Sequence, residues 1–307
     1  MSRIELTGLR GNLPIGAMAA FGVLRICSRA AAIEGPKLCW TRTGGDYHAA
    51  LLTGNEIGEG ALVDVLLTDV RRQRSALPEW EQVKTQTQEQ YQLVALAAVA
   101  AASLRDRGDV DWLAALTAEL AVGNDGKMQS TPFDMSVARQ KFLADARRLA
   151  SDLMGDDAAP AYMEALFGPW KYRDDQHSLG WDPSTVKLGA FTYKAPTGMA
   201  NLGVRAAVWL AFESLPLFPC FSSRGLETRG FIRSGRKAFL SWPVWRPAIG
   251  LAELATLLGW TALYDSDHLD RAEMQGRGVA AIYRSERFKP NQYMTTFRPP
   301  ALAYVED

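Results

Sequence analysis

Residues 8–29, GLRGNLPIGAMAAFGVLRICSR, place a glycine-bounded turn in front of an apolar helix. Gly8 and Gly11 permit a tight turn, and Pro14 stands where a helix begins. The preceding residues, Arg3 to Leu9, alternate in polarity as a β-strand does. The stretch has neither the Lys-Ser/Thr pair of a Walker loop nor the glycine spacing of a GxGxxG motif. It therefore predicts a strand, a turn and a helix packed on that strand, and not a nucleotide loop.

The rest of the pattern indicates an α+β fold, with mixed antiparallel sheet regions at both ends and a helical middle. Two strand-like segments flank the glycine-rich residues 44–46 and complete a β-α-β-β opening. Apolar residues recur at helical spacing from about residue 60 to residue 153. The expected later elements are helices near 62–70, 83–107, 112–122, 134–154 and after Pro160, an exposed connection over 168–184, a strand over 188–194, a helix over 201–215, a hairpin of 225–233 and 236–242 around Ser234-Gly235, a helix over 251–258 and a strand over 278–288.

This organisation divides the chain into three portions. They are an N-terminal β-α-β-β portion (1–60), a helical region (61–168) and a C-terminal α+β portion with a basic hairpin (169–307). At 307 residues the chain can bury a sizeable core in one or two compact domains.

Charge and cysteine usage restrict the function classes. The chain has 34 basic and 34 acidic residues, so only a local surface can attract a polyanion. Residues 224–298 hold twelve Lys/Arg against seven Asp/Glu. Three cysteines without a CxxC pair predict buried thiols in a reducing compartment. No leader segment and no apolar stretch of about 18 residues is evident, so we expect a cytoplasmic protein without membrane contact.

The sequence offers no convincing catalytic group. The three histidines form no HExxH or clustered metal motif, and no serine lies in a GxSxG elbow. We therefore expect no catalytic residues, no metal and no cofactor. One alternative is a small-molecule enzyme with an unrecognised pocket at YDSDHLD (264–270), where Asp265, Asp267 and His268 could bind a divalent ion; a polar surface loop explains the same residues.

Two basic stretches interleave cations with aromatic residues, which suits a nucleic-acid surface. They are RGLETRGFIRSGRKAFLSWPVW (224–245) and GRGVAAIYRSERFKPNQY (276–293). Alternation along a strand can place cations on one face and aromatics on the other. The competing interpretations are a solvated charged face and an edge strand guarded by charges. The candidate nucleic-acid-binding residues are Arg229, Arg233, Arg236, Lys237, Arg284, Arg287 and Lys289, with Arg10 and Asn12 beside the N-terminus of the first helix.

Three stretches together resemble a known family. They are LPIGAMAAFGVLRI (13–26), FESLPLFPCF (212–221) and LSWPVWRPAIGLAELATLL (240–258), which leads to GVAAIYRSERF (278–288). They are similar to large-subunit proteins of type I CRISPR surveillance complexes of subtype G (formerly U), or to the related extension domain of that subtype's helicase-nuclease.

The resemblance implies a non-catalytic subunit of an RNA-guided antiviral ribonucleoprotein complex. Such a subunit joins guide RNA and other complex subunits, helps to inspect the short motif beside the target DNA, and holds the opened strands. In this hypothesis the cations of both basic stretches converge on one continuous face. The alternative is a protein scaffold or adaptor subunit of the same kind of assembly, in which the helical middle makes the contacts and the basic strands are only solvated.

Overall fold

The first sheet and the helix behind it form as the opening residues predict. The computed structural model describes residues 2–103, 107–137, 139–175, 178–185, 202–265, 269–292 and 294–306. Strands β1 (Ser2–Arg10), β2 (Lys37–Thr43) and β3 (Asp46–Thr53) form an antiparallel sheet in the order β1-β3-β2. Helix α1 (Pro14–Arg29) connects β1 to β2. The predicted β-α-β-β opening is confirmed.

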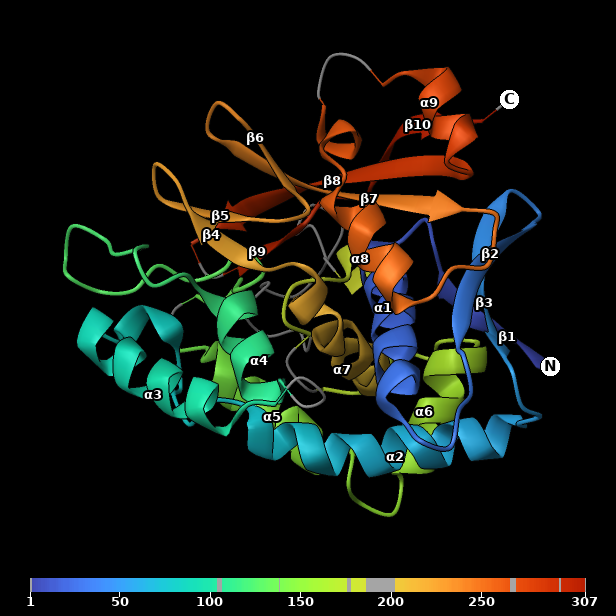
Figure 1. Cartoon of the computed structure of the whole chain (residues 1–307), viewed down its shortest axis with the longest axis horizontal. Helices are drawn as coiled ribbons and strands as arrows, with labels where there is room; N and C mark the ends of the chain where they lie inside the picture. The colour runs from blue at the N-terminus through green and yellow to red at the C-terminus, as the bar shows by residue number, and fades with distance from the viewer. Residues whose placement is uncertain are drawn as a thin grey trace, which may run out of the picture.

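A second antiparallel sheet occupies the C-terminal part, so the fold is α+β as predicted (Figure 1). Its strands follow the order β10-β8-β7-β6, and β9 pairs with β8. A separate two-stranded ribbon is made by β4 and β5. The strands are β4 (Cys220–Ser222), β5 (Leu226–Thr228), β6 (Phe231–Ser234), β7 (Lys237–Trp245), β8 (Val279–Asn291), β9 (Met294–Phe297) and β10 (Ala301–Val305).

The expected hairpin differs from the structure in two details. The predicted strand over 225–233 is broken at Gly230, which has φ of 89° and lies so close to Phe218 that a Cβ would be 2.7 Å from its ring. The chain therefore leaves one sheet and enters the other at this glycine. Ser234 pairs with Lys237, so the tight turn is made by residues 235–236 and not by Ser234-Gly235.

Helices α3, α4 and α5 of the middle region are shorter than their apolar periodicity predicts, whereas α2 extends beyond the predicted residues 62–70 at both ends. The side chain of Thr87 accepts a hydrogen bond from the amide of Gln90 in a capping box, which starts α3 five residues later than expected. The α-helices after α1 are α2 (Glu59–Ala76), α3 (Gln88–Ala101), α4 (Gly108–Leu116), α5 (Phe142–Asp152), α6 (Ala158–Phe167), α7 (Arg205–Glu213), α8 (Leu251–Gly259) and α9 (Arg271–Gly276), with 3-10 turns at Val83–Thr85, Pro183–Thr185, Leu215–Leu217 and Thr261–Tyr264.

Two expectations for the middle region are wrong. The helix expected from Asp134 begins only at Phe142, because the buried Asp134 carboxylate accepts a hydrogen bond from the amide of Ser136 and stabilises a turn. The connection over 168–184 is not exposed throughout: Trp181 is fully buried and stacks on Phe212, with ring centroids 6.1 Å apart. The strand expected over 188–194 lies outside the described residues.

Helix α1 runs through the centre of the molecule (Figure 1). Every residue from Pro14 to Cys27 is buried, as expected for a helix that is covered on all sides. The first sheet covers one side, the second sheet lies above it, and α7 lies alongside it. One cluster of buried hydrophobic residues takes in side chains from both sheets and from the helices between them. The division at residues 60 and 168 remains a prediction.

Buried charges join α1, α2 and α7. Glu213 accepts hydrogen bonds from Arg25 at 2.8 Å and from Arg29 at 2.7 Å, and Arg29 also binds Asp69 through Nε at 2.7 Å. Burial, with a smaller contribution from the positive charge of Arg29, lowers the pKa of Arg25 to about 10. The carboxylates supply the counter-charge that a buried and a partly buried arginine need at this helix contact.

We predict that Gly22→Ala destabilises the protein by about 3 kcal/mol, because overpacking displaces neighbouring backbone. A Cβ at Gly22 would lie 1.8 Å from the carbonyl oxygen of Leu210 on α7. Gly60→Ala is the matched control, since a Cβ there meets open space in α2. It should gain about 0.5 kcal/mol through helix propensity. Urea unfolding of both variants gives the comparison, and equal effects would contradict the close α1–α7 contact.

Candidate nucleic-acid interface

The two basic stretches meet in the second sheet, because β7 pairs with β8. Arg233 lies opposite Ala238, and Ala238 lies opposite Arg287. Directly paired residues point to the same face of a sheet, so Arg233 and Arg287 flank Ala238 on one face. Adjacent strands are about 4.8 Å apart, so these two arginines start from backbone positions about 10 Å apart.

The cations nevertheless divide between the two faces of the sheet. Arg284 is three residues from Arg287 on the same strand, so it points to the opposite face. There it donates hydrogen bonds to the carbonyl oxygens of Leu263 at 3.4 Å and Asp265 at 2.5 Å. Burial lowers the pKa of Arg284. The expected single continuous cationic face is therefore not formed by all the candidate residues.

Two more candidates are engaged by the protein itself. Arg287 donates to the carbonyl oxygen of Asp134 at 3.2 Å, and burial lowers its pKa. Lys237 forms an ion pair with Glu286 at 3.5 Å while its side chain stays 62% exposed. Arg287 thus anchors the sheet to the helical region, whereas Lys237 retains access to solvent.

Exposed cations do gather at one end of the second sheet. Arg236 lies in the β6–β7 turn, and Lys289 lies two residues beyond Arg287 toward the same end. The guanidinium of Arg233 donates to the carbonyl oxygen of Leu226 at 3.0 Å, which holds the β4–β5 ribbon beside this turn. Figure 1 shows the tips of both hairpins on the same side of the molecule. We name this surface the cationic end and define it as Arg224, Arg233, Arg236, Lys237 and Lys289.

The cationic end carries little neutralising charge. Arg224, Arg236 and Lys289 are exposed, and among the residues that the structure describes no ion pair involves them. Glu286 is shared between Lys237 and Arg298, the latter at 3.1 Å. The surface therefore presents more positive than negative side chains to solvent.

The remaining candidates lie elsewhere in the fold. Arg229 donates to the carbonyl oxygen of Ala255 at 3.5 Å, near the C-terminal end of α8, where a cation is favoured. Asn12 donates to Asp46 at 2.7 Å. Arg10 ends β1, and a Cβ at Gly16 would lie 2.3 Å from the Arg10 carbonyl oxygen, so the chain itself fills the space beside the α1 N-terminus.

Sequence reasoning missed two contacts in which a cation lies over an aromatic ring, although Arg277 belongs to the second basic stretch. The guanidinium carbon of Arg277 is 4.2 Å from the centroid of Trp260, and that of Arg298 is 4.2 Å from the centroid of Phe288. In each pair the partners are ten or more residues apart along the chain. Only the fold brings them together, so no local spacing could have indicated these contacts.

The expectation that the chain has no catalytic residue, metal or cofactor stays a prediction. Within the described part of the chain, no cluster of three or more His, Cys, Asp or Glu residues is arranged to hold a metal ion. Asp267 and His268 of the alternative enzyme site lie outside the described residues, and Asp265 uses its backbone carbonyl to bind Arg284. No described helix is long and apolar enough to cross a membrane.

Comparison with known proteins adds no family to this description. Neither the protein-family models nor the curated proteins contain a match to the chain.

The thiols give a testable consequence of burial. Burial raises the pKa of Cys27 to about 12 and that of Cys220 to about 11. At pH 8 only about one Cys220 thiol in a thousand is then ionised, and the thiolate is the reactive form. We predict slow labelling of both thiols by a disulfide reagent in the native protein at pH 8, with the Cys220 rate rising about tenfold per pH unit toward pH 10. Cys220 is half-buried and not fully buried as expected, so rapid labelling of native Cys220 at pH 8 would contradict its raised pKa, and unfolded protein provides the control.

Proposed function

We propose that this chain is a non-catalytic nucleic-acid-binding subunit of an RNA-guided antiviral complex, and that its cationic end contacts the phosphate backbone. The observation that carries the proposal is the gathering of exposed cations from β6, β7, β8 and the β4–β5 turn at one end of a sheet. Membership of a CRISPR complex is supported only by the resemblance of the three quoted stretches. In this proposal the partners are guide RNA, target DNA and other complex subunits, and the chain acts in the cytoplasm.

The composition of the cationic end suits a backbone contact more than base readout. Arginine and lysine donors bind phosphate oxygens without regard to sequence. Phe221 on β4 is 49% exposed and lies three residues before Arg224, so an aromatic ring is available for stacking on an unpaired base. A cationic turn beside an exposed ring favours a single strand over a duplex.

We predict that reversing two cations, Arg236→Glu with Lys289→Glu, weakens binding of single-stranded DNA or RNA at least tenfold. Each lost phosphate contact should also reduce the slope of log K against log[salt] by about 0.7. Fluorescence anisotropy with a labelled 20-nucleotide strand at several salt concentrations measures both quantities.

The matched control reverses two other exposed arginines, Arg71→Glu on α2 with Arg148→Glu on α5. It applies the same change of net charge to the helical side of the molecule. Equal weakening by both double variants would indicate a diffuse charge effect. Unchanged affinity and salt slope in the cationic-end variant would remove the proposal.

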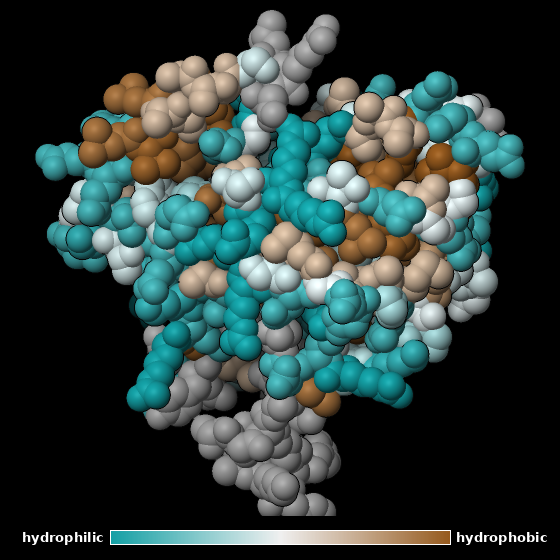
Figure 2. Space-filling view, turned by 90° about the horizontal axis from the view of Figure 1, so that it is seen from below, coloured by the Kyte–Doolittle hydropathy of each residue, from teal (hydrophilic) through white to brown (hydrophobic). Residues whose placement is uncertain are grey.

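A second candidate function, that of an adaptor, is favoured by one observation. Helix α3 exposes large apolar side chains: Leu93, Leu96 and Val99 are 71%, 70% and 62% exposed, and the neighbouring Leu120 is 74% exposed. Figure 2 shows hydrophobic residues gathered at the end of the molecule where α3 lies. Monomeric proteins rarely leave such residues together in water, and contiguous apolar patches often mark contacts with other proteins.

We predict that Leu93→Glu with Leu96→Glu abolishes co-purification of neighbouring complex subunits after nuclease treatment, because a charged face cannot be desolvated at the contact. The cationic-end double variant should keep those subunits under the same conditions. Retention of all subunits by the α3 variant would remove the adaptor function. Loss of subunits from the unmodified protein after nuclease treatment would show that nucleic acid holds the assembly together, which also removes it.

A further inference from the structure

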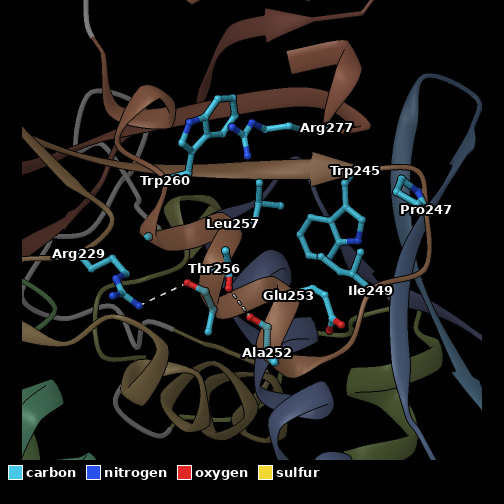
Figure 3. Close-up of a pocket in the computed structure, with 12 residues that line it drawn as sticks. Arg229, Trp245, Pro247, Ile249, Ala252, Glu253, Thr256, Leu257, Trp260 and Arg277 are labelled. Carbon is cyan, nitrogen blue, oxygen red and sulfur yellow. Dashed lines mark hydrogen bonds between the residues drawn. The ribbon is translucent and has the colours of Figure 1, made fainter. Parts of the chain in front are cut away.

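A groove of about 930 Å³ lies between α8 and the end of β7 (Figure 3). This volume is within the range of small-molecule sites. Trp245, Leu257 and Ile249 form much of its apolar lining. The indole nitrogen of Trp245 already donates to the carbonyl oxygen of Leu38 at 3.0 Å. Trp245 is only 1% exposed and stacks on Phe21, so it lies behind the groove, and the accessible apolar lining includes Leu257 and Ile249.

The upper wall of the groove is a cation held over an indole. Arg277 lies over Trp260 at 4.2 Å and donates to Glu273 at 3.3 Å, and its side chain is 50% exposed. Two contacts thus fix the guanidinium, with one side covered by the ring. Guanidinium groups stack on flat π systems from either side. The uncovered side of Arg277 is a ready surface for a second planar ring.

Two further charged groups line the same groove. Arg229 is held at the end of α8 by the carbonyl oxygen of Ala255 at 3.5 Å and lies against Gly259, where a Cβ would be 3.6 Å from its Nη2. Glu253, in the first turn of α8, is exposed at the groove. The groove therefore combines an apolar lining, two cations and one carboxylate.

We propose that this groove binds a ribonucleotide. Arg277 stacks on the base, Arg229 donates to the phosphate, and Glu253 accepts hydrogen bonds from the ribose hydroxyls. An acidic residue is the usual acceptor for ribose hydroxyls in nucleotide sites, and it would repel a ligand that offers only phosphate. A free mononucleotide and one nucleotide of an RNA strand present the same chemistry. The groove and the cationic end have no residue in common, so either can fail without the other.

Calorimetric titration with AMP, with dAMP and with a 5′-phosphorylated RNA trinucleotide tests the site. Arg277→Met keeps much of the contact with Trp260 but removes the planar cation, and we expect affinity to fall at least tenfold. Arg271→Met is the matched control, because Arg271 begins the helix that Arg277 follows but lies over Tyr304, outside the groove. Its affinity should stay within twofold of the unmodified protein.

A second variant guards against local misfolding. Thr256 is exposed on α8 and lines the groove, so Thr256→Phe should fill the groove, abolish binding and leave the thermal unfolding temperature unchanged. Binding of AMP would identify a free nucleotide as ligand, and binding of the trinucleotide alone would identify an RNA strand. No binding of either, equal affinity for AMP and dAMP, or binding that survives both Arg277→Met and Thr256→Phe would overturn the proposal.

Discussion

The close contact of α1 with α7 at Gly22 is the constraint on which the rest of the structure depends. A side chain at this position would meet the backbone of Leu210. The approach brings the buried Arg25 and the partly buried Arg29 of α1 to Glu213 of α7, which supplies the counter-charge for both. Removing Glu213, or separating the two helices, would leave buried charge without a partner, which is among the costliest defects in a protein interior. Helix α1 can therefore be buried on every side.

The second sheet is fixed in turn by aromatic residues that rest on α1. The ring of Phe21 stacks on Trp245 with centroids 5.7 Å apart, and Trp242 donates its indole N–H to the carbonyl oxygen of Gly11 at 2.8 Å. Both tryptophans belong to the C-terminal half of β7. This half is held against the core, whereas the other end of the strand reaches the β6–β7 turn at the surface (Figure 1). The cationic end therefore lies at the solvent-exposed end of a strand whose other end is packed against the core.

The sequence predicted the elements whose signals are local, and missed what tertiary contacts decide. Pro14 and the glycines at 44 and 45 act within a few residues, so the first helix and hairpin were predictable. Trp181 lies in a polar stretch, and its burial depends on Phe212, which is distant in sequence. Asp134 is of a residue type that is favoured at helix N-caps, but it stabilises a turn instead. Propensity alone does not separate these outcomes.

The candidate interface was predictable to the same degree. The two basic stretches were identified from the sequence. That their strands, β7 and β8, pair in one sheet could not be predicted from either stretch alone. The spacing of three between Arg284 and Arg287 does carry information, because it places these residues on opposite faces of any strand. What the spacing does not specify is the layer packed against each face, and hence which cation binds a backbone carbonyl and which remains in water.

This distinction explains how a chain without net charge can present the cationic surface that we propose binds a polyanion. Cations in the middle of a strand lie beneath neighbouring layers, so Arg284 and Arg287 lose solvent and bind carbonyl oxygens. Cations at the hairpin tip extend beyond those layers into water, where hydration makes the free-energy cost of an unpaired charge small. A sheet covered by helices can therefore display exposed arginines and lysines chiefly at its ends. The cationic end is consequently small, and in the proposed function it is better matched to a few nucleotides of a strand than to the length of a duplex.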